Sequence, residues 1–178
     1  IRTRLVGSEM CIRDRISGGI AAYKSLDLIR SLIKIKCEVK TILTKGGTEF
    51  VTPLSIASLS KNKVYSDMYS VENESEMDHI SLSRWADLIL IAPATSNIIA
   101  KMSQGISDDL ATTVVQASNK SIFVCPAMNV RMWEHASNKQ NLEKIKSYNY
   151  RIIGPFNGEM ACGEYGDGRM ADIECILK

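Results

Sequence analysis

Two side chains in this sequence could carry proton-transfer chemistry. His79 lies in MDHISL among polar neighbours, and an imidazole with a pKa near ~6.5 suits proton transfer at neutral pH. Cys162 lies within residues 158–170, GEMACGEYGDGRM, where closely spaced glycines disfavour a regular helix or strand. Long glycine-rich loops are typical of lids and binding loops, so we expect this thiol to be accessible. The plain alternatives are a structural or exposed histidine and an incidental thiol in a loose terminal segment.

Polar or glycine-containing turns follow four predicted strands. They are Ser17-Gly18-Gly19, Thr44-Lys45-Gly46, PATSN at residues 93–97 and PAMN at residues 126–129. Glycines ahead of a helix let the backbone approach a phosphate, whose charge the helix N-terminus favours. SGG alone is equally consistent with a tight turn between a strand and a helix. In PATSN, one polar side chain can cap a helix while the others face a phosphate or a polar ring edge.

The elements that must position these turns alternate along the chain. Apolar spacing predicts helices over residues 20–36, 47–60, 96–103, 108–118 and 137–147, with Pro53 able to break the second. Apolar or alternating runs predict strands over residues 38–44, 87–93, 121–126 and 151–154, and residues 61–78 read as irregular. This alternation predicts an α/β fold with a mostly parallel sheet. Such sheets bind ligands beyond the carboxyl ends of their strands, where the four turns fall.

Composition and charge narrow the classes of partner. The chain has 178 residues, 45% of them hydrophobic and 24% charged, as expected of one soluble domain. The net charge of +2 equals the contribution of residues 1–15, four arginines against two acidic residues, so no nucleic acid or membrane surface is expected as a partner. Five cysteines without a CxxC pair predict reduced thiols in a cytoplasmic protein and no metal site. No apolar run is long enough for a transmembrane helix.

The stretch ahead of the first turn does not resemble a buried strand. A central parallel strand is typically a run of Val, Ile and Leu, because helices cover both of its faces. Residues 7–15 instead read GSEMCIRDR. We therefore predict that residues 1–15 are a non-native or disordered leader, foreign to the domain, and that the domain proper comprises residues 16–178. Recruitment of Met10-Cys11-Ile12 into the strand position is the alternative.

Six motifs in order point to one family. They are ISGGIAAYKS, TKGGTEFVTP, HISLSRWADLILIAPATSNIIAK, SDDLATT, PAMNVRMW and GEMACGEYGDGRM. Together they resemble the homo-oligomeric flavin-containing cysteine decarboxylases, and among these most closely the phosphopantothenoylcysteine decarboxylase domain of coenzyme A biosynthesis. The resemblance runs from about Ile16 to the C-terminus.

The resemblance implies a three-layer flavodoxin-like or Rossmann-like flavoprotein that binds FMN and assembles as a trimer or a multiple of trimers. The implied enzyme is a lyase that converts 4'-phosphopantothenoylcysteine to 4'-phosphopantetheine. It does so through flavin oxidation to a thioaldehyde, loss of carbon dioxide and re-reduction. Bacterial relatives usually continue into a phosphopantothenate-cysteine ligase, so a fused or separate ligase is an expected partner.

The resemblance also assigns roles by motif position. It implies that His79 is a base or orienting group, that Asn129 holds the substrate carboxylate, and that Cys162 donates a proton late in the reaction. The residues expected to bind substrate are Asn129, Met132, Glu159, Met160 and Ala161. The residues expected to contact the flavin are Ser17, Gly18, Gly19, Thr44, Thr95 and Asn97.

Other functions are consistent with some of these motifs. A peptidyl-cysteine decarboxylase and a flavin prenyltransferase share the implied fold, and the PAMN and ACGE segments together disfavour the prenyltransferase. A non-catalytic flavin-binding regulatory subunit is the alternative from another class. It predicts loss of His79 or Cys162, and both residues are present.

Overall fold

Six parallel strands form the central sheet of the protein. The computed structural model describes residues 10–66 and 78–178. Within them the strand order is β3 (Val64–Tyr65), β2 (Cys37–Leu43), β1 (Met10–Ile16), β4 (Leu88–Ala94), β5 (Ser121–Pro126) and β6 (Arg151–Ile152). The order reverses between β1 and β4, so this sheet has a switch point at which ligands characteristically bind.

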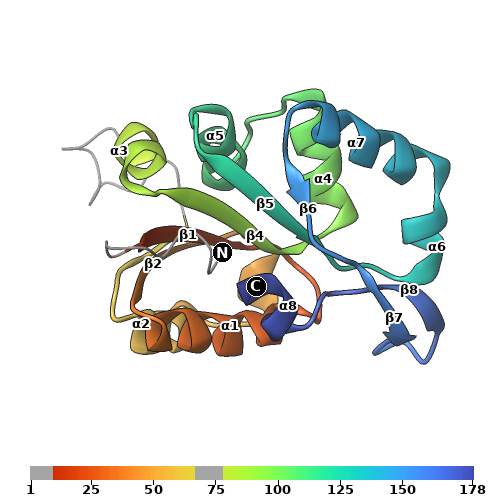
Figure 1. Ribbon diagram of the computed structural model, residues 1–178, viewed down its shortest axis with the longest axis horizontal. Helices are drawn as coiled ribbons and strands as arrows, with labels where there is room; N and C mark the ends of the chain where they lie inside the picture. The colour runs from red at the N-terminus through yellow and green to blue at the C-terminus, as the bar shows by residue number, and fades with distance from the viewer. Residues whose placement is uncertain (1–9, 67–77) are drawn as a thin grey trace.

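Helices cover both faces of this sheet (Figure 1). One face carries α1 (Ala22–Lys34), α2 (Pro53–Ser60) and α8 (Ile173–Leu177), and the other carries α3 (Asp78–Trp85), α4 (Ser96–Gln104), α5 (Leu110–Gln116) and α7 (Ala136–Ser147). The predicted three-layer α/β fold is therefore confirmed. None of the helices in residues 10–66 and 78–178 is long and apolar enough to cross a membrane.

The core lies on the two faces of the middle strands. Every residue of β4 is buried, which is why this strand reads as a continuous apolar run. Leu90 and Phe123 pack into the cluster beneath α1, whereas Ile89 and Val124 pack into the cluster beneath α4 and α5. This rigid centre fixes the positions of the turns that follow the strands.

The structure corrects the prediction for the second helix and the C-terminal loop. The helix predicted over residues 47–60 is divided into η2 (Gly47–Glu49) and α2, which begins at Pro53 with Thr52 as its N-cap. The glycine-rich segment is an antiparallel hairpin of β7 (Phe156–Glu159) and β8 (Tyr165–Arg169), not an irregular loop. Gly158 pairs with Gly166 in this hairpin, so the ladder forms without cross-strand side-chain contacts at that point.

The lead-in to the first turn belongs to the sheet. Residues 10–16 form β1, which pairs with both β2 and β4, although Asp14 and Arg15 are fully buried there. Burial raises the pKa of Asp14 to about 8. Backbone pairing on both sides holds this strand in place despite its charged side chains. The domain therefore includes Met10–Arg15 as structure, and the foreign origin of this segment stays a prediction.

Candidate active site

A cavity of about 450 Å³ opens at the carboxyl ends of β1, β4 and β5. Its walls come from the turn after β1 and the first turn of α1, the turns after β4 and β5, and the β7–β8 hairpin. The lining residues that the sequence predicted are Gly18, Gly19, Thr95, Asn129, Met132, Glu159, Met160, Ala161 and Cys162. Segments from four parts of the chain thus meet at the predicted edge of the sheet.

Ser17 joins two of these turns instead of lining the cavity. Its buried hydroxyl donates to the carbonyl of Pro93 at 2.6 Å and accepts from the backbone N–H of Thr95 at 3.2 Å. Gly18 and Gly19 form the wall itself, and Gly19 has a φ of +131°, a conformation that favours glycine. The SGG turn is therefore fixed against the PATSN turn.

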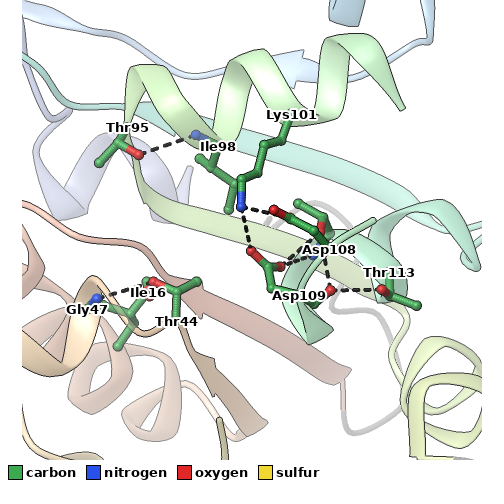
Figure 2. A network of polar contacts seen from close by, with 10 residues as sticks. Ile16, Thr44, Gly47, Thr95, Ile98, Lys101, Asp108, Asp109 and Thr113 are labelled. Atoms are coloured by element: carbon green, nitrogen blue, oxygen red, sulfur yellow. Dashed lines mark hydrogen bonds and ion pairs between the residues drawn. The ribbon is translucent and has the colours of Figure 1, made fainter. Parts of the chain in front are cut away.

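The turns after β1 and β2 also touch. A Cβ atom added to Gly18 would lie 2.9 Å from the carbonyl oxygen of Gly46. Thr44 donates its hydroxyl to the carbonyl of Ile16 and accepts from the N–H of Gly47, both at 3.2 Å (Figure 2). Thr44 lines a separate cavity of about 380 Å³ next to α5, not the main one.

The PATSN segment divides its polar side chains between capping and the cavity. Thr95 is the N-cap of α4 and accepts from the N–H of Ile98 at 3.4 Å, while it also lines the cavity beside Ser96 (Figure 2). Asn97 is exposed and does not line either cavity, so the structure separates it from the other predicted flavin contacts.

Asn129 presents amide donors to the cavity. It is the N-cap of α6 (Val130–Glu134), and its Oδ1 accepts from the N–H of Met132 at 2.8 Å. Because the carbonyl side of the amide is used by the cap, the Nδ2 group is left to donate to a ligand. Two N–H donors beside the half-exposed Met132 suit a carboxylate that carries an apolar chain.

The tip of the β7–β8 hairpin places a thiol and a carboxylate together. Backbone hydrogen bonds at 2.9 Å join Met160 N–H to the carbonyl of Glu164, and Gly163 N–H to the carbonyl of Met160. Cys162 Sγ donates to Glu164 Oε2 at 3.7 Å. Cys162 is exposed, as the sequence predicted, whereas Cys125 is buried.

The base of the hairpin is attached to the β5 turn. Met128 N–H donates to the carbonyl of Gly168 at 3.0 Å. A Cβ atom at Gly168 would clash with the Met128 carbonyl oxygen, so only glycine fits at this contact. The hairpin therefore meets the cavity at a fixed place.

His79 lies in the first turn of α3, and its side chain lies outside the described part of the structure. The role of its imidazole stays a prediction. Sequence reasoning missed several lining residues, namely Ile20, Ala21, Tyr23, Lys24, Met128, Gly168, Arg169 and Met170. The one available signal was charge, since Lys24 and Arg169 lie within motifs already expected at the site.

A second polar network lies beside the smaller cavity that Thr44 lines (Figure 2). Lys101 of α4 pairs with Asp108 at 2.7 Å and with Asp109 at 3.2 Å. Burial raises the pKa of Asp109, but hydrogen bonds from Thr112 and Lys101 outweigh burial and hold that pKa below its usual range. The hydrogen bond that Lys101 donates to the Asp108 carboxylate raises the pKa of Lys101. These contacts fix the start of α5 against α4.

Comparison with known proteins decides the family. Residues 12–178 match the model of the family described as Flavoprotein, which is nearly the whole chain. The chain belongs to the flavoprotein family. This flavoprotein is 41% identical over 163 residues to the coenzyme A biosynthesis bifunctional protein CoaBC of Bacillus subtilis, and 43% identical over 162 residues to that of Haemophilus influenzae. These matches cover 92% and 91% of this flavoprotein, which spans about 40% of the length of each relative.

Solved structures agree with the fold of this flavoprotein. A PPC decarboxylase mutant complexed with pantothenoylaminoethenethiol superposes with a TM-score of 0.84 and 30% identity, covering 96% of this chain and 95% of the other. The FMN binding protein AtHal3 gives a TM-score of 0.81 and 30% identity, with coverage of 96% and 94%. The peptidyl-cysteine decarboxylase EPID is 24% identical, with a TM-score of 0.80 and coverage of 96% and 97%, and so shares the fold.

Proposed function

We propose that this flavoprotein decarboxylates 4'-phosphopantothenoylcysteine to 4'-phosphopantetheine in coenzyme A biosynthesis. The observation that carries the proposal is the meeting of the Asn129 amide and the Cys162 thiol in one cavity at the switch point of the sheet. The named activities of the bacterial CoaBC relatives and of the PPC decarboxylase structure support this substrate.

We infer that the cofactor is FMN, and the residues of the site fit it. The first turn of α1 lines the cavity, and this helix begins without a side-chain cap or an acidic residue, so its N-terminus favours a phosphate. Gly18 and Gly19 would hold the cofactor close to the backbone, and Thr95 would offer a hydroxyl group at the neighbouring turn, whereas Thr44 lies at the separate cavity. When bound, FMN supplies reversible two-electron oxidation of the cysteine moiety.

The side chains of this chain would orient the substrate and move its protons. Asn129 donates its amide N–H groups to the carboxylate that leaves as carbon dioxide. Cys162 gives its S–H proton to the carbon of the product enethiolate, and Glu164 lies in place to return a proton to the sulfur. Glu159, Met160 and Ala161 cover the substrate from the hairpin, and His79 is the proposed base for the oxidative step.

We further propose a trimer or multiple of trimers, a cytoplasmic location, and a fused or separate phosphopantothenate-cysteine ligase as partner. The bifunctional names of the relatives support the ligase. Ile20 and Tyr23 at the cavity are 56% and 54% exposed, which suits a neighbouring subunit that covers them. A peptidyl-cysteine substrate is not favoured, since the likeness to EPID is one of fold.

The test is direct. The purified protein should show a flavin absorbance spectrum and release carbon dioxide from 4'-phosphopantothenoylcysteine. A cysteine-terminated peptide serves as the competing substrate. A colourless protein without turnover after FMN addition, or turnover of the peptide alone, would contradict the proposal.

A further inference from the structure

Arg169 is the cationic side chain of the β7–β8 hairpin that lines the cavity. Its Nη2 lies 3.3 Å from Asp172 Oδ2. Its Nε is buried and has no hydrogen-bond partner among the described residues. A buried arginine N–H group without an acceptor lowers the stability of the protein. A ligand that supplies an acceptor to this group would therefore bind more tightly.

The hairpin makes room for this guanidinium. A Cβ atom at Gly158, on the facing strand, would lie 3.1 Å from Arg169 Nε and 3.4 Å from its Cδ. The arginine stem therefore lies against the bare backbone of Gly158. A larger residue at that position would push the guanidinium away from its present place.

The charges around the cavity favour an anion. Lys24 lines it from α1 and Arg169 from β8, while Glu159 is the acidic residue among the lining side chains. Lys24 forms no ion pair within residues 10–66 and 78–178. Two cations on different walls, against one carboxylate, leave a net positive lining.

We propose that Arg169, assisted by Lys24, binds the phosphate monoester of the substrate and so selects phosphorylated over unphosphorylated pantothenoylcysteine. This inference rests on the function proposed above. The substrate has two anionic groups, and the neutral amide of Asn129 suits the carboxylate, which must leave. The dianionic phosphate stays bound during the whole reaction. The planar, permanently charged guanidinium of Arg169 suits it, because its N–H groups can bind two phosphate oxygens at once. Asp172 holds the guanidinium until the phosphate replaces it.

The experiment compares two substrates in the flavin-loaded enzyme. Arg169→Met should lower kcat/KM for 4'-phosphopantothenoylcysteine roughly 100-fold, mainly through KM, the size expected for a lost charge-assisted contact. The loss with pantothenoylcysteine should be at least tenfold smaller. Arg30→Met, an exposed arginine on α1 away from the cavity, is the matched control and should leave the substrate preference intact.

The substitution Asp172→Asn should change KM in the opposite direction to Arg169→Met. It removes the competitor for the guanidinium without removing a helix cap, because the Asp172 side chain does not cap α8. KM for the phosphorylated substrate should fall by roughly two- to threefold, the scale of an exposed ion pair.

Three results would overturn the inference. They are an equal loss on both substrates in Arg169→Met, loss of bound FMN in that variant, which would assign the arginine to the flavin phosphate, and no response in Asp172→Asn. If the wild-type protein turns over neither substrate, the proposed function fails. Calorimetric binding of 4'-phosphopantetheine against pantetheine then tests Arg169 by itself, and equal affinities for the two would reject it.

Discussion

The thiol of Cys162 donates a hydrogen bond to the carboxylate of Glu164 at the tip of the β7–β8 hairpin, with Sγ and Oε2 3.7 Å apart. Both side chains are exposed, and Cys162 lines the cavity. The carboxylate orients the S–H group at the edge of the cavity. Under the proposed function, this pair would be the route by which a proton reaches the cavity from outside.

Cys162→Ser should abolish repeated turnover, but the variant should still release carbon dioxide in its first cycle. A hydroxyl is a much weaker acid than a thiol and would not protonate the enethiolate, so the decarboxylated intermediate should accumulate. Single-turnover mass spectrometry measures it. Cys175→Ser, another exposed cysteine but outside the cavity, should behave as wild type. Full product formation by Cys162→Ser would remove the proton-donor role.

Glu164→Gln should slow multiple turnover by roughly 10- to 100-fold, because proton return to the sulfur loses its carrier. The first turnover should be nearly unaffected, since the S–H proton is already present. A burst followed by a slow steady state in rapid-quench kinetics is the expected signature. Equal slowing of both phases would show that Glu164 acts on the chemistry in another way.

Asn129→Asp should distinguish the two roles of Asn129, which are capping helix α6 and binding the substrate carboxylate. Aspartate still accepts from Met132 N–H, so the melting temperature should change by no more than a few degrees. The new carboxylate would face the substrate carboxylate and raise KM by roughly 100-fold or more through repulsion and lost donors. Asn129→Ala should lose the cap too, at about 1 kcal/mol of stability. An active Asn129→Asp enzyme would reject the carboxylate contact.

Asp14 should make stability depend on pH. Its pKa is raised from 3.8 to about 8 in the folded protein by burial, so the folded state holds a proton that the unfolded state has released. Stability should therefore fall as pH rises from about 4 to about 8 and level off above, by an amount on the order of several kcal/mol.

Replacing Asp14 checks this assignment. Asp14→Val should raise the free energy of unfolding at neutral pH and flatten the profile, as measured by urea titration at several pH values. Asp27→Asn, at an exposed aspartate on α1, should retain the wild-type slope. A wild-type profile that rises between pH 4 and pH 8 would contradict the prediction.

Gly18→Ala should displace the first turn and weaken cofactor binding at least tenfold. The added Cβ would lie 2.9 Å from the Gly46 carbonyl oxygen, a backbone atom that cannot move aside alone. Gly46→Ala is the matched control, because its Cβ would be 3.4 Å from Gly18 Cα, an ordinary contact. Flavin titration measures both variants. Equal affinities would show that the two turns are not rigidly apposed.

The sequence predicted the middle of the fold well because β4 and β5 are buried on both faces and read as apolar runs. It failed at β1, where pairing with two neighbours imposes a strand on Asp14 and Arg15. It also failed at the hairpin, where paired glycines hide the strand pattern. Both errors have one cause, since local side-chain patterns do not reveal partners that are distant in the chain.

The site was predictable where strand ends converge and not where the chain folds back. The turns carrying Gly18, Thr95 and Asn129 line one cavity because parallel strands share an edge. Arg169 lies in the segment that was expected to be a binding loop, but its own role was not predicted, because nothing near it in sequence indicates that this segment is a hairpin packed on the β5 turn. Thr44 lies at the correct edge, but on the side that faces α5.

The contact between Met128 and Gly168 also limits how the cavity can open. The base of the hairpin is bonded to the β5 turn and has no space for a side chain, so it cannot act as the pivot of a wide swing. The tip, residues 160–164, carries the thiol and, within the described part of the chain, has no such contact with the β5 turn. If the tip moves to admit a ligand, we expect Cys162 to move with it, so the thiol would face the ligand only after the tip has returned.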